Sequence, residues 1–63
     1  MNRADYHREH AERAEAEARR LLAQRATLGA RWLGWVAAEL YRLSPAPYAA
    51  MVRRELERLN TEG

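Results

Sequence analysis

Apolar side chains recur along residues 4–43 with the spacing of an amphipathic helix. One row, with members seven positions apart, holds Ala4, Ala11, Ala18, Arg25 and Trp32, and a neighbouring row holds His7, Ala14, Leu21, Leu28 and Trp35. Residues 2–43 contain no proline and are rich in Ala, Glu, Arg and Leu, which favour helix. The pattern predicts one long helix over about 2–43.

Residues 27–30 are the weak point of this predicted helix. Thr27 is a residue type that caps new helices, and a glycine such as Gly29 costs about 1 kcal/mol relative to alanine inside a helix. No Glu or Gln stands three positions after Thr27, so the capping box is missing. We therefore expect a continuous helix, and the alternative is a three-helix monomer with a break near 27–30.

A strong helix boundary follows at Leu43-Ser44-Pro45-Ala46-Pro47. The residue before a proline avoids helical geometry, whereas proline is accepted in the first turn of a new helix. The apolar positions Tyr48, Val52, Leu56 and Leu59 then predict a second helix over about 45–60. The predicted fold class is therefore all-α. Because the connection is short, residues 1–63 are expected to form a single small helical hairpin domain.

The two predicted helices differ greatly in length, at about 63 Å and about 24 Å. The short helix is therefore expected to cover only about residues 27–43. It is expected to leave bare one side of the Trp32–Trp35 cluster and the rows Ala11, Ala14, Ala18, Leu21 and Leu22. An uncovered apolar stripe predicts a second chain, in a dimeric, coiled-coil-like helical bundle. The residues expected at the dimer or partner interface are Leu21, Leu22, Arg25, Leu28, Trp32, Trp35 and Val36.

Arg25 is the one charged residue at the centre of this stripe. A buried arginine needs an acidic partner, and Glu39 and Glu55 border the apolar faces of their helices. Alternatively, the stem of Arg25 covers apolar surface while its guanidinium reaches solvent, or it contacts an acidic partner protein. The sequence leaves these three arrangements open.

Arginine supplies all 11 basic residues, yet the net charge is only +2 because nine acids are interspersed. On a continuous helix, four arginines fall on one face opposite the apolar stripe, and three more lie on the second helix. These possible nucleic-acid contacts are Arg13, Arg20, Arg31 and Arg42, and Arg53, Arg54 and Arg58. Interrupting glutamates and the lack of interleaved aromatic residues favour a solvated charged face instead.

Groups for catalysis or metal binding are scarce. The chain has no cysteine, a single serine, Ser44, which is expected to cap a helix, and no glycine-rich loop. His7 and His10 lack a third ligand of matched spacing, so we expect no metal and no cofactor. The charged N-terminal segment is unlike a signal peptide, and the apolar runs are too short to span a membrane. A cytoplasmic protein without enzymatic activity is expected.

Together these features favour a small protein–protein interaction module. We expect a homodimer that binds and modulates or inhibits a partner protein through aromatic and arginine side chains, the residue types that dominate binding energy. The alternative is a small nucleic-acid-binding regulator that uses the arginine-lined helices. A purely structural oligomerisation module is a third possibility.

Overall fold

The computed structural model describes residues 3–62 and is helical throughout, with no strand among these residues. Its elements are α1 (Arg3–Ala23), α2 (Arg25–Leu28), the 3-10 turn η1 (Gly29–Arg31), α3 (Trp32–Arg42) and α4 (Ala46–Glu62). The all-α prediction is confirmed. The expected helix start at residue 2 lies outside the described residues.

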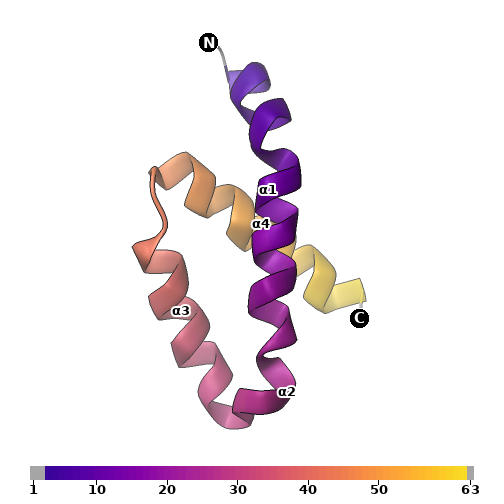
Figure 1. The fold of residues 1–63 in the computed structure, drawn as a ribbon, viewed down its shortest axis with the longest axis vertical. Helices are drawn as coiled ribbons and strands as arrows, with labels where there is room; N and C mark the ends of the chain where they lie inside the picture. The colour runs from indigo at the N-terminus through magenta and orange to yellow at the C-terminus, as the bar shows by residue number, and fades with distance from the viewer. Residues whose placement is uncertain (1–2, 63) are drawn as a thin grey trace.

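The long helical segment is bent rather than straight, and α1 and α3 form the two arms of the bend (Figure 1). Regular α-helix stops at Gln24, and Gly29 has φ +55° and ψ −127°. This is a backbone conformation that residues with a Cβ adopt only with strain. The continuous helix predicted over 2–43 is therefore wrong in this detail. The interruption begins at Gln24, earlier than the weak point predicted at 27–30, and it includes Gly29.

The second helix begins where the proline pair predicts. Leu43 is extended, with ψ 141°, and the amides of Tyr48 and Ala49 donate hydrogen bonds to the carbonyl of Pro45. Pro47 lies in the first turn of α4, where a missing amide hydrogen is harmless. The tight connection directs α4 back across the molecule and behind α1 in Figure 1.

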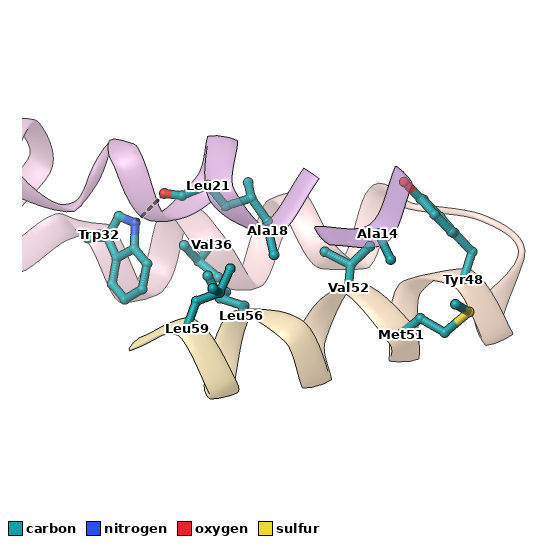
Figure 2. Packing of buried hydrophobic residues seen from close by; sticks show 10 residues of the cluster. All are labelled: Ala14, Ala18, Leu21, Trp32, Val36, Tyr48, Met51, Val52, Leu56 and Leu59. Carbon is teal, nitrogen blue, oxygen red and sulfur yellow. Dashed lines mark hydrogen bonds between the residues drawn. The ribbon is translucent and has the colours of Figure 1, made fainter. Parts of the chain in front are cut away.

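Helix α4 packs mainly on α1 and less on α3. Ala14, Ala18 and Leu21 have no exposed surface, and Val52 of α4 points toward Ala14 (Figure 2). The core also includes Trp32, Val36, Tyr48, Met51, Leu56 and Leu59. The expectation that the short helix covers residues 27–43 and leaves Ala14, Ala18 and Leu21 bare is wrong. The small side chains of Ala14 and Ala18 instead let the α4 backbone approach α1 closely.

Polar contacts join the three long helices around this core. The Trp32 indole nitrogen donates a hydrogen bond to the carbonyl of Leu21 at 2.8 Å, which ties the start of α3 to the end of α1 (Figure 2). Arg20 of α1 lies 3.5 Å from Glu39 of α3. Arg58 of α4 lies 3.5 Å from Glu15 of α1. The molecule is flat, with principal extents of 40 × 23 × 14 Å, so one side of each helix faces outward.

Candidate interaction surface on helix α3

The outward side of α3 carries no charge. Its five residues are all exposed and fall on one arc of the helix at 100° per residue. We call this surface the α3 face: Leu33, Gly34, Ala37, Ala38 and Tyr41. Leu33 is 74% exposed and Tyr41 is 92% exposed, and they are the two large hydrophobic side chains left uncovered among residues 3–62.

The opposite side of α3 explains why this face points outward. Trp32 and Val36 are buried in the core, and Leu40 and Leu43 pack against it. Glu39 is half-buried and lies 3.5 Å from both Arg20 and Arg42. Helix α3 is apolar nearly all round. The rest of the chain covers one side of it and leaves another apolar side facing solvent. This arrangement is typical of a helix that packs against a further partner.

A groove between α3 and α4 continues the α3 face. It consists of two adjoining hollows of about 360 Å³ and about 200 Å³ that share Leu40 and Arg53. The larger is also lined by Ala37, Tyr41, Ala49 and Ala50, and the smaller by Trp32, Leu33, Val36, Leu56, Glu57 and Asn60. This α3–α4 groove is therefore apolar, with charged groups only on its α4 side.

The charged groups of the groove are Arg53 and Glu57, one helical turn apart on α4. Both are exposed, and neither side chain has an ion pair or hydrogen bond with another of the described residues. The groove thus offers one cation and one anion to a molecule bound in it.

Several arginines outside the groove are engaged by glutamates or by a ring. Arg20 pairs with Glu17 and Glu39, and Arg42 with Glu39. The hydrogen bond with Glu17 raises the pKa of Arg20 above its ordinary value. Arg13 lies over the ring of Tyr48, 5.4 Å from its centre.

Arg58 of α4 has ion pairs with three glutamates, Glu15, Glu55 and Glu62. Hydrogen bonds with Glu55 and Glu62 raise the pKa of Arg58, and the bond with Arg58 lowers the pKa of Glu55.

The bend also divides the arginine line expected along a continuous helix. Arg13 and Arg20 lie on α1, whereas Arg31 ends the 3-10 turn and Arg42 ends α3. Of the seven arginines considered for nucleic acid, three are exposed and have neither an ion pair nor a ring contact with any of the residues 3–62. These are Arg31, Arg53 and Arg54. They stand on two different elements, η1 and α4.

The seven residues expected at an interface fall into three groups. Leu21, Trp32 and Val36 are buried in the chain's own core. Leu22, Leu28 and Trp35 are partly buried against that core. Arg25 is exposed, and its guanidinium donates a hydrogen bond to the side-chain oxygen of Asn60. The pairing of Arg25 with Glu39 or Glu55 is therefore wrong, since those carboxylates bind other arginines.

The α3 face itself was not among the expected interface residues. The signal that finds it is the run WLGWVAA at 32–38, which has no charged residue at any point around the helix. Such a helix needs apolar cover on more than one side. The stripe of large residues at Trp32, Trp35 and Val36 marks the side that the chain itself covers. The interface residues predicted from this stripe therefore miss the exposed apolar side.

The two histidines take different positions near the start of α1. The His10 ring stacks on Tyr6 with centres 4.1 Å apart, and its Nδ1 lies 2.9 Å from the Tyr6 carbonyl. His7 lines a hollow of about 90 Å³ together with Met51 and Glu55. Within residues 3–62, no group of three or more His, Cys, Asp or Glu side chains is placed to hold a metal ion.

No family model, curated protein or solved structure matches this chain. Among the described residues, no helix has the length and apolar character to cross a membrane. The function is therefore inferred from the α3 face and the groove beside it.

Proposed function

We propose that this protein is a small non-enzymatic protein–protein interaction module. It binds a partner protein through the α3 face and modulates or inhibits that partner by occupying its surface. The single observation that carries this proposal is the exposure of Leu33 and Tyr41 on an uncharged helix face. Solvent exposure of one apolar side chain is ordinary, but two on a contiguous apolar arc are typical of an interaction site.

The composition of the α3 face suits a helical or flat partner. Burying Leu33 fully contributes about 1.5–3 kcal/mol, and Tyr41 adds a large rigid aromatic ring with a hydroxyl at its tip. Gly34, Ala37 and Ala38 lie between them and allow a partner backbone to approach closely. Two anchors around a flat centre match the arrangement in which a few residues supply most of the binding energy.

A nucleic-acid-binding regulator is the weaker candidate. Phosphate binding needs a coherent positive surface. Here Arg20, Arg42 and Arg58 are each paired with a glutamate. The three candidate arginines without such a pair or a ring contact lie on two separate elements, η1 and α4. The α3 face has no charged side chain that could bind a phosphate.

Site-specific photo-crosslinking tests the proposal. A photoreactive phenylalanine derivative at position 41 should cross-link a protein in cells that make this chain, and Leu33→Glu should abolish the product. The matched control places the same group at position 16, where Ala16 is also exposed but lies on α1. Equal products at positions 41 and 16 would contradict binding through the α3 face, provided that circular dichroism shows both variants to be helical.

A further inference from the structure

We infer that the α3 face and the α3–α4 groove form the contact between two copies of this chain, related by a two-fold axis near Ala37. This inference rests on the proposed function and names the first occupant of the same surface. Three independent features of the surface point to a second copy: its sequence symmetry, an otherwise unexplained glycine, and the paired charges in the groove.

The α3 face is self-complementary when two copies of α3 lie antiparallel. A two-fold axis at Ala37 brings together residues at equal distances before and after it. Leu33 then meets Tyr41 of the second copy, and this contact occurs twice. Each of the two exposed hydrophobic residues thereby covers the other.

Gly34 has no role within its own chain. A Cβ added at this position meets no atom within 4 Å, and the backbone is ordinary α-helix. A glycine in the interior of a helix is less favourable than an alanine, because the unfolded chain has more backbone freedom to lose. Close approach of another backbone is the usual reason for such a glycine, and two antiparallel copies of α3 supply it.

The charges of the groove identify a second copy more specifically than the apolar residues do. Arg53 and Glu57 stand one turn apart, and neither has a side-chain partner among residues 3–62. Two-fold symmetry brings Arg53 of each copy toward Glu57 of the other, which forms two crossed ion pairs. A single-signed partner would leave one of these charges without a mate, whereas a second copy neutralises both.

Charge reversal provides the test, with mass in solution as the readout. Analytical ultracentrifugation of the wild-type chain should show a species of twice 7.3 kDa at a concentration of about 100 μM. Arg53→Glu alone and Glu57→Arg alone should each weaken the dimer about tenfold or more, because like charges then face each other. An equimolar mixture of the two variants should restore dimerisation, since the carboxylate introduced in one variant then faces the guanidinium introduced in the other.

Arg8→Glu and Glu12→Arg are the matched controls. Arg8 and Glu12 have the same order and spacing on α1, are both exposed, and have no side-chain ion pair within residues 3–62. Each reversal changes the net charge and the i,i+4 charge pattern of its helix as much as the corresponding reversal at Arg53 or Glu57 does. It should nevertheless leave the dimer unaffected. Wild-type chain that stays at 7.3 kDa, or a mixture no tighter than either variant alone, overturns the inference.

The outcomes also separate this inference from the proposed function. A monomeric wild-type chain whose position 41 cross-links a different protein overturns self-association and leaves the proposed function standing. A dimer in which position 41 cross-links only to another copy of this chain supports self-association and contradicts the binding of a separate partner. Dimerisation together with capture of another protein supports both, and the two occupants then compete for the α3 face.

Discussion

The indole nitrogen of Trp32 donates a 2.8 Å hydrogen bond to the backbone carbonyl of Leu21. The two residues belong to different arms of the bent helical segment, so this bond closes the corner formed by α2 and η1. The Leu21 carbonyl also accepts the amide of Gln24 at 3.2 Å, where regular helix ends. The tryptophan thus satisfies a carbonyl that a continuous helix would have used itself.

We expect Trp32→Phe to destabilise the protein by about 1–3 kcal/mol, because the Leu21 carbonyl loses one of its two donors in a buried position. Urea denaturation followed by circular dichroism measures this. Trp35→Phe is the control, since Trp35 is only partly buried and its indole has no hydrogen bond with residues 3–62. Equal losses for the two variants would show that the Trp32 hydrogen bond contributes nothing.

The two described glycines should respond oppositely to alanine. Gly29→Ala should cost about 1–3 kcal/mol, because φ +55° strains any residue with a Cβ. Gly34→Ala should stabilise the isolated chain by about 0.5–1 kcal/mol, since it lies in regular helix with open space around it. Thermal unfolding at low protein concentration measures both. A stabilising Gly29→Ala would mean that the corner between α1 and α3 is not held as described.

The close contact between α1 and α4 predicts that Ala18 does not accept a larger side chain. Ala18 is fully buried between these helices. Ala18→Leu should therefore destabilise the protein by about 1–3 kcal/mol through overpacking. Ala16→Leu, at an exposed position of the same helix, should change the free energy of unfolding by less than about 0.5 kcal/mol. If Ala18→Leu were stabilising, α4 would have to lie elsewhere.

Acid should weaken the fold partly through Glu55. The hydrogen bond from Arg58 holds the pKa of this carboxyl below its ordinary value of 4.5. The unfolded chain then takes up the proton first, so this contribution is present above pH 4.5 and is lost as the pH falls through the lower folded value.

Glu55→Gln should therefore lower stability near neutral pH and flatten the dependence of stability on pH as the pH falls below 4.5. Urea midpoints measured across this range test the prediction. Glu12→Gln is the control, because Glu12 is exposed and has no ion pair with residues 3–62. Parallel pH profiles for wild type and Glu55→Gln would contradict a role for the Glu55–Arg58 pair.

The interface residues show where inference from sequence reaches its limit. The spacing that places Trp32 and Val36 on an apolar stripe is correct, and both residues are buried. They are buried by their own chain, however, whereas Leu33 and Tyr41 on the other side of α3 remain exposed. Helical period identifies apolar sides of a helix, but in a segment that is apolar all round it does not say which side the chain covers.

Local properties of the sequence determined the helical content, the boundary between residues 43 and 46, and the weak point at 27–30. Proline geometry, glycine freedom and residue period act over a few positions, so they can be inferred without knowing the rest of the fold. Only the tertiary structure decided that α4 covers Ala14 and Ala18 and that the α3 face stays outside. That choice depends on the direction that the chain takes through Gln24 and Gly29. The two backbone angles of Gly29 set this direction, and the spacing of apolar side chains does not encode it.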